Sequence, residues 1–187
     1  MPKLWNQTLE MHRHDVRHAL LGTTAALVAE HGLRGVTMSQ IAEQAGVGRA
    51  TLYKYFPDVD SILLAWHERQ IGEHLKLLVD ARDTASTATA ALRAVLDTYA
   101  LITHDQHGSE HAELLHRGEH VTHAHQHLHS LVRDLITQAA KEGSIRTDTS
   151  TDELATFCIR ATTAAMDLRT KTAVRRLVTV IVSGLKP

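Results

Sequence analysis

The sequence predicts an all-α protein with about nine helices. Its 187 residues include only three prolines, Pro2, Pro57 and Pro187, so long stretches lack the residue that most strongly breaks helices. Apolar residues recur every three or four positions, and no stretch shows the strict alternation typical of strands. Aromatic residues make up 4% of the chain. We therefore expect a core built mainly from Leu, Ile, Val, Ala and Met.

The order of the helices follows from apolar periodicity and from the residues that begin and end helices. Thr37 with Gln40, and Ser150 with Glu153, form two capping boxes, in which a hydroxyl residue is followed three positions later by Glu or Gln. Gly32 is expected to end the first helix, because glycine adopts the left-handed conformation found there. The expected helices cover 13–31, 37–46, 48–55, 58–82, 88–104, 110–118, 119–141, 152–168 and 170–184.

Charge and cysteine content restrict the function classes. The net charge is −1 and the isoelectric point about 7.0, so any binding to nucleic acid must use a local basic region. Residues 33–56 provide one, with Arg34, Arg49 and Lys54 against Glu43 alone. The single cysteine suits a reducing compartment, and neither a signal peptide nor a membrane-spanning run is present. We expect a cytoplasmic protein with no membrane partner.

The most informative segment is 37–56, which predicts two short helices joined by a tight turn. Ile41, Ala42 and Ala45 give the first helix an apolar face, and Gly46 permits the turn. Leu52 and Phe56, four residues apart, fix the inward face of the second helix. The remaining side chains of that helix are left to face outward or to flank the inward face: Arg49, Ala50, Thr51, Tyr53, Lys54 and Tyr55.

This outward set suits a helix that enters the major groove of DNA. Arg49 can donate two hydrogen bonds to a guanine, and Ala50 allows close approach. Thr51, Tyr53 and Lys54 can contact phosphates, which positions the helix without reading sequence. The alternative is a helical hairpin whose polar face is only solvated. Two outward tyrosines beside Arg and Lys favour the DNA-binding interpretation.

Over about residues 14–70 the sequence resembles the TetR family of bacterial regulators. The resemblance depends on Gly32, Thr37, the segment 41–47 and the segment 51–57. It implies a DNA-binding head, here 1–57, on a helical body, 58–187, that binds a ligand and dimerises. It also implies phosphate contacts by Thr37, Ser39, Tyr53, Lys54 and Tyr55, and contacts to bases and backbone by Arg49, Ala50 and Thr51.

Two positions depart from the family pattern. Gly48 occupies a place where the family usually has a serine that caps the recognition helix. The next long helix begins with Asp58-Val-Asp60, where the family commonly offers a lysine to the DNA backbone. We therefore expect part of the affinity for DNA to come from Lys3, Arg13 and Arg17.

The last two helices predict a homodimer. Residues 152–168 and 170–185 are apolar on more than one face, so they should be buried against both the chain's own core and a second subunit. A central helix of a monomer is the alternative. A dimer is favoured because two recognition helices can then read a palindromic operator. The resemblance to the TetR family then implies a repressor, released when a small-molecule effector binds the body. We expect an apolar pocket for this effector between the fourth helix and helices 88–141. Tyr99 and Phe157 are candidate pocket walls, because the core has few other aromatic residues.

Nine of the fifteen histidines lie between 104 and 129, which raises an alternative function, a regulator responsive to metal or pH. Two histidines four apart on a helix can share a divalent metal. We expect instead that these side chains flank the core, and we predict neither a metal site nor a cofactor. No motif of an enzyme appears, and Cys158 lies in an apolar stripe, so we expect no catalytic activity. The candidate metal ligands are His116, His120, His123 and His127.

Overall fold

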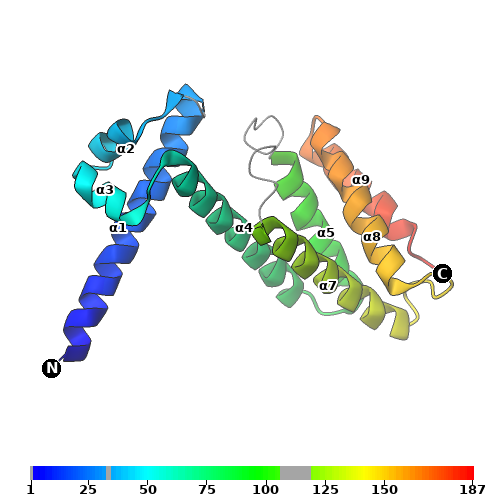
Figure 1. Cartoon of the computed structure of the whole chain (residues 1–187). Coiled ribbons are helices and arrows are strands. Elements are labelled where there is room, and N and C mark those ends of the chain that lie inside the picture. The colour runs from blue at the N-terminus through cyan, green and yellow to red at the C-terminus, as the bar shows by residue number, and fades with distance from the viewer. Residues whose placement is uncertain (1, 33–34, 106–118) are drawn as a thin grey trace. The chain divides into compact units, whose positions relative to one another are not determined.

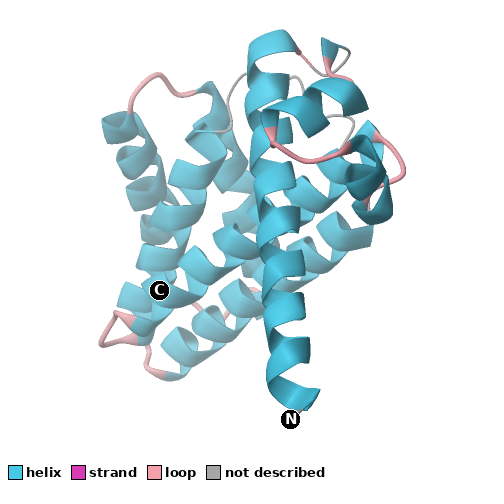
Figure 2. Ribbon diagram, turned by 90° about the vertical axis from the view of Figure 1, so that its left-hand side faces the viewer, coloured by secondary structure: helices cyan, strands magenta, loops and turns pink. Residues whose placement is uncertain are grey.

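A computed structural model describes residues 2–32, 35–105 and 119–187, with the backbone alone at 2–10, 12, 119 and 120. All regular elements of these residues are helices (Figure 2), so the predicted all-α class is confirmed. Eight α-helices are present there, and the helix expected at 110–118 lies outside the described residues. The α-helices, labelled in Figure 1, are α1 (Pro2–His31), α2 (Met38–Gln44), α3 (Arg49–Tyr55), α4 (Val59–Asp83), α5 (Ala88–Asp105), α7 (Glu119–Lys141), α8 (Thr151–Thr162) and α9 (Lys171–Ser183). A short 3-10 helix, η2 (Thr163–Asp167), follows α8.

The chain forms two compact units, residues 1–70 and 71–187. The boundary therefore falls inside α4, whereas the sequence suggested a division between 57 and 58. The first turns of α4 bury Ile62, Leu63 and Ala65, which belong to the N-terminal unit. Apolar burial in these turns explains why the compact unit extends past Pro57.

The N-terminal unit is built around α1, which contacts α2, and α2 contacts α3. Leu20, Leu27 and Val28 of α1 are buried, and Thr24 is buried with its hydroxyl donating to the Leu20 carbonyl at 2.8 Å. The helix begins at Pro2, earlier than the expected residue 13. Pro2 is tolerated because it lies in the first turn of the helix. Residues 3–12 contain neither proline nor glycine, so nothing in this segment stops the helix.

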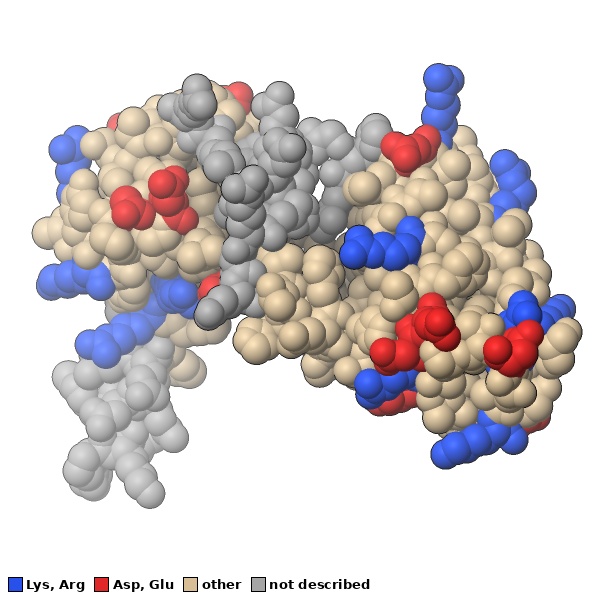
Figure 3. Space-filling view, turned by 45° about the vertical axis from the view of Figure 1, so that its right-hand side comes forward, with Lys and Arg blue, Asp and Glu red and all other residues tan. Residues whose placement is uncertain are grey.

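The C-terminal unit is a helical bundle in which α5 contacts α7, α8, η2 and α9. Its core is almost entirely aliphatic and includes Leu92, Leu96, Val132, Ile136 and Val178. The main chain also ties distant segments together, because the Arg146 amide donates to the Leu185 carbonyl at 2.9 Å. Acidic and basic side chains are interspersed on the face of this unit seen in Figure 3.

The helix expected at 152–168 is shorter than predicted. The α-helix ends at Thr162 and tightens into η2 over Thr163–Asp167. The Thr162 hydroxyl is buried and donates to the Cys158 carbonyl at 2.7 Å, and the Thr163 hydroxyl donates to the Arg160 carbonyl at 2.7 Å. Such hydroxyl bonds to the preceding turn compete with the regular helical pattern, and short 3-10 segments are common at helix ends.

A candidate DNA-binding head and effector domain

The turn between α2 and α3 has the geometry of a helix-turn-helix. Gly46 has φ of 66°, in the left-handed region that glycine adopts without strain. The Val47 amide donates to the Ala42 carbonyl at 3.0 Å, which folds the chain back at the end of α2. Ile41 and Ala42 are buried, so the inward face predicted for α2 is confirmed at these positions.

The start of α2 is fixed by the predicted capping box. The Thr37 amide donates to Gln40 Oε1 at 2.8 Å, and the Gln40 amide donates to Thr37 Oγ1 at 3.3 Å. These bonds satisfy backbone donors that the first turn of a helix otherwise leaves free. Thr37 is exposed and Ser39 is half-buried, so the structure leaves both residues at the surface of the head near the start of α2.

The recognition helix α3 turns its apolar face inward, as predicted. Leu52 is fully buried and Phe56, which caps the end of the helix, is 4% exposed. The predicted outward residues divide into two groups. Arg49, Ala50, Tyr53 and Lys54 are exposed, whereas Thr51 and Tyr55 are half-buried. Gly48 is the N-cap and forms no side-chain cap bond, as expected from its departure from the family pattern.

Two further residues organise the ends of this head. The guanidinium carbon of Arg17 lies 5.5 Å from the centroid of the Phe56 ring, a cation–π contact that ties α1 to the end of α3. Asp58 caps α4, because its Oδ1 accepts from the Ser61 amide at 2.8 Å. Arg13 is exposed, and the Lys3 side chain lies outside the described residues. Sequence reasoning singled out Arg17 for its charge but not for the contact with Phe56.

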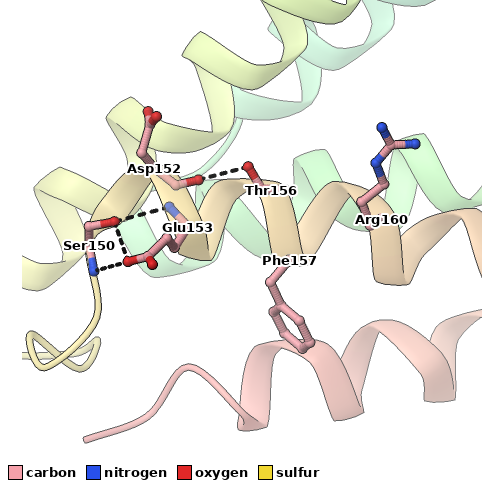
Figure 4. Close-up of a pocket in the computed structure, with 6 residues that line it drawn as sticks. All are labelled: Ser150, Asp152, Glu153, Thr156, Phe157 and Arg160. Carbon is pink, nitrogen blue, oxygen red and sulfur yellow. Dashed lines mark hydrogen bonds between the residues drawn. The ribbon is translucent and has the colours of Figure 1, made fainter.

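The C-terminal unit has two surface hollows that concern the expected effector site. Tyr99 lines a hollow between α5, α7 and α8 with a volume of about 220 Å³. Phe157 lines a different and more open one, formed along α8 and shown in Figure 4. Phe157 and Arg160 leave α8 in different directions in that view, and Phe157 points toward α9. The lining residues of the Tyr99 hollow are Tyr99, His125, His129, Thr156, Ile159, Arg160 and Thr163.

Tyr99 and Phe157 were expected to form walls of one pocket, and the structure does not bring them together. Phe157 is 48% exposed, because the core of the unit takes the side of α8 that carries Leu154, Cys158 and Ala155. The expected position between the fourth helix and helices 88–141 also differs, since α8 supplies much of the Tyr99 hollow. Apolar periodicity alone does not distinguish the two sides of a helix that is apolar nearly all round.

Large apolar side chains remain exposed on the last three helical segments of this unit. Phe157 on α8 is joined by Met166 on η2, which is 43% exposed, and by Val180 on α9, which is 69% exposed. Leu177 is half-buried and Ile181 is 2% exposed, so these two belong to the protomer's own core or its edge. The expectation that 152–168 and 170–185 are apolar on more than one face therefore matches the described side chains.

Comparison with known proteins assigns the family. Residues 20–66 match the sequence profile described as bacterial regulatory proteins, tetR family. Residues 86–187 match the C-terminal domain profile of SbtR-like transcriptional regulators, which spans more than half of the chain. The chain belongs to the TetR family. It is a DNA-binding transcriptional regulator, and the resemblance over residues 14–70 is confirmed.

Individual TetR relatives extend the comparison. The HTH-type transcriptional repressor KstR2 of Rhodococcus jostii is 26% identical over 140 residues, which cover 71% of this chain and 69% of the relative. A TetR/AcrR-family regulator from Thermobifida fusca has a similar fold, with a TM-score of 0.77 at 14% identity, over 92% of this chain and 100% of that chain. FadR from Bacillus subtilis, solved with stearoyl-CoA, has a TM-score of 0.66 at 18% identity over 90% and 98%.

The described histidines of α7 line two different hollows, on either side of the buried stripe of that helix, as expected. His123 and His127 are exposed and line one hollow with Arg82 and Asp134, whereas His125 and His129 line the Tyr99 hollow. The side chains of His116 and His120 lie outside the described residues. In the rest of the chain no three His, Cys, Asp or Glu residues are grouped to hold a metal ion. The comparisons give no support to a metal- or pH-responsive regulator.

Cys158 is a core residue, as predicted. It is fully buried, and burial raises the pKa of its thiol to about 12. A thiol held neutral in this way is a poor nucleophile. Across the described helices, none combines the length and apolar character that crossing a bilayer requires.

Proposed function

We propose that this TetR-family chain is a cytoplasmic repressor that binds a palindromic operator as a homodimer. A small-molecule effector, bound within residues 71–187, would release the operator. The observation that carries this proposal is the outward face of α3, where Arg49, Tyr53 and Lys54 are exposed opposite the buried Leu52. Repression is supported by the Rhodococcus jostii relative, which is itself a repressor.

The contacts proposed for this face are of two kinds, those that recognise base edges and those that position the helix on the DNA backbone. Arg49 and Ala50 begin α3, and the start of a recognition helix is the part that reaches base edges. Thr37, Ser39, Thr51, Tyr53, Lys54 and Tyr55 are proposed to contact the DNA backbone, where hydroxyl and ammonium groups meet phosphates. Gly48 brings no side chain to the start of α3, so nothing there hinders close approach of the backbone to DNA.

Selection from a random duplex library at low salt tests the operator proposal. We expect an inverted repeat to be enriched. Lys54→Ala should weaken binding to all sequences and make the slope of log affinity against log salt shallower by about one per subunit. Arg49→Ala should reduce discrimination at one base pair, by roughly 1–3 kcal/mol. Lys186→Ala, an exposed lysine of the other unit, is the matched control and should change neither property. Failure to enrich any duplex sequence would contradict the proposal.

Dimerisation is proposed through α8, η2 and α9, which expose the apolar side chains of Phe157, Met166 and Val180. Isolated apolar residues are common at protein surfaces, but here they lie on successive segments at the end of the chain. Val180→Asp should place a charge at the seam without touching the protomer core, and light scattering should then report a monomer. Met11→Asp is a control of similar exposure, 64%, in the N-terminal unit. A Val180→Asp dimer of unchanged affinity would place the interface elsewhere.

Release by an effector requires coupling between two binding events. A ligand that binds the free repressor more tightly than the DNA-bound one must lower operator affinity by the same factor. Compounds that raise the melting temperature of the chain should therefore be tested for loss of operator binding. A compound that stabilises the C-terminal unit and leaves operator affinity unchanged would contradict this part of the proposal.

A further inference from the structure

The hollow lined by Tyr99 is lined by hydrogen-bond donors and by a cation. Tyr99 comes from α5, His125 and His129 from α7, and Thr156 and Arg160 from α8. Ile159 adds an apolar side chain to the lining. No Asp or Glu is among the described residues that line the hollow. Its chemistry therefore favours an acceptor with negative charge over a cation.

Arg160 supplies the positive charge that lines the hollow. Within the part of the chain that the structure describes, no acidic group forms an ion pair with it. The acids of the preceding turns are engaged elsewhere. Asp152 lies 4.0 Å from the Arg133 guanidinium, and Glu153 accepts from the Ser150 hydroxyl and amide at 2.6 and 3.1 Å. The Arg160 guanidinium is thus available to a ligand.

The positive charge of Arg160 acts on the Tyr99 phenol, which also lines the hollow. Burial raises the pKa of the Tyr99 phenol, and the positive charge of Arg160 acts in the opposite direction. Tyr99 is half-buried, whereas Arg160 and His125 are exposed, so the hollow has an inner wall and a charged rim. A ligand with an apolar body and one anionic end matches both parts.

One histidine of the hollow is oriented by α8. His129 Nε2 lies 3.2 Å from the Thr156 hydroxyl oxygen, and that hydroxyl donates to the Asp152 carbonyl at 3.0 Å (Figure 4 shows the second bond). Because the Thr156 proton is committed to the carbonyl, its oxygen must accept from His129, which assigns the proton to Nε2. The ring is therefore held at the wall of the hollow by α8.

We propose that this hollow is the effector site and that it binds a small organic carboxylate, with Arg160 as counter-ion and Tyr99 and Ile159 against its apolar body. This inference rests on the effector-controlled repression proposed above. The volume of about 220 Å³ is below the range usual for drug-sized ligands, which indicates a compact acid. Arginine suits the role because its planar donors match both oxygens of a carboxylate.

Calorimetric titration of the full-length chain with three acids and their amides tests the inference. The probes are benzoate, phenylacetate and hexanoate, each paired with the uncharged amide of the same shape. We expect at least one acid to bind about tenfold or more tightly than its amide, because charge-assisted hydrogen bonds are stronger than neutral ones. Arg160→Gln should remove that difference, and Arg160→Lys should retain part of it. Arg169→Gln, an exposed arginine that does not line the hollow, is the matched control.

Three results would overturn the inference. They are equal binding of every acid and its amide, an Arg160→Gln chain with wild-type preference and an unchanged melting temperature, or competition by inorganic phosphate as strong as by the acids. The last would assign the hollow to a phosphorylated ligand. Operator binding is measured in parallel, so the two proposals fail separately. An acid that binds through Arg160 without releasing DNA would leave the carboxylate site standing and contradict effector control. Release of DNA by a neutral compound alone would support effector control and contradict the carboxylate site.

Discussion

The two units of this chain are made of the same kind of element but differ in the range of the interactions that position their functional residues. In residues 1–70, α2 and α3 are fixed by caps and turns a few residues long, such as the bonds between Thr37 and Gln40. In residues 71–187, the positions come from segments far apart in sequence. Arg93 Nη2 donates to Thr179 Oγ1 at 2.8 Å, and a ring nitrogen of His104 lies 3.2 Å from the Ala165 carbonyl. A DNA-binding face can therefore be read locally, whereas an effector site depends on how whole helices pack.

The strongest test of this difference removes one core side chain from each unit. Leu52→Ala and Leu92→Ala each truncate a fully buried leucine, and each should cost about 2–5 kcal/mol of stability. We expect Leu52→Ala to abolish operator binding near its lowered melting temperature while light scattering still reports the dimer. Leu92→Ala should affect oligomeric state and acid binding first. Loss of the dimer in Leu52→Ala would show that the units do not unfold separately.

The two capping boxes offer the same comparison at a smaller scale. Thr37→Ala and Ser150→Ala remove equivalent bonds at the start of α2 and α8, and each should cost about 1 kcal/mol. Only Thr37→Ala should also weaken operator binding, because it loosens the helix next to α3. Urea unfolding and fluorescence anisotropy with a labelled operator measure the two effects. Equal loss of DNA affinity in both variants would contradict the separation of the units.

Two aspartates of the C-terminal unit should respond to pH in opposite directions. Burial raises the pKa of Asp97, whose Oδ1 is buried without a hydrogen-bond partner. The folded chain therefore holds this proton more tightly than the unfolded chain, and the charged form costs stability above the folded pKa. Asp97→Asn should raise the free energy of unfolding near neutral pH, by less than about 1 kcal/mol, and the gain should shrink as the pH falls.

Asp148 provides the opposite case as a control. Its hydrogen bonds to Arg146 lower the pKa of the carboxyl to about 2. Its stabilising effect is present above the ordinary pKa and is lost as the pH falls toward 2. Asp148→Asn should therefore be slightly destabilising at neutral pH and neutral in strong acid. The same pH dependence for both variants would contradict the assignment of burial as the cause at Asp97.

The smallest expected effect is a gain in the stability of the N-terminal unit. Gly48 has φ of −68° and ψ of 145°, a conformation open to any residue, and an added Cβ would meet nothing closer than Thr51 Oγ1 at 3.9 Å. Gly48→Ser should supply the missing cap and stabilise α3 by a few tenths of a kcal/mol. Gly46→Ser, the same change two residues earlier, should destabilise the unit because φ is 66° there. Thermal unfolding distinguishes the two signs.

The accuracy of the predictions made from the sequence also differs between the two units. Both capping boxes, the turn at Gly46 and the inward side chains Leu52 and Phe56 were predicted, because each depends on residues within one turn of a helix. The DNA contacts of the outward face remain predictions. The early start of α1 was missed because the signal for the first helix was the apolar spacing that begins further along the chain.

The effector domain was less accessible to sequence reasoning. Tyr99 and Phe157 line different hollows, because the pattern of α8 cannot indicate which of its apolar sides faces the core, and their contact with a ligand remains a prediction. Arg160 was overlooked as a candidate, since a lone arginine on an amphipathic helix usually means only a solvated face. The useful signal was a cation four residues from Thr156, on the side of α8 that α7 approaches with His129.

Burial of Cys158 has a practical consequence for spectroscopy. The chain has one cysteine, and its thiol is enclosed and stays protonated near neutral pH. The native protein should therefore react very little with maleimides, which need an accessible thiolate. A cysteine introduced at an exposed position outside the proposed DNA-binding face and dimer seam, as in Glu30→Cys or Lys141→Cys, would be the only residue to carry a spin label or fluorophore. Distances between two labelled copies then become measurable in solution, with and without operator, and no native residue has to be removed first.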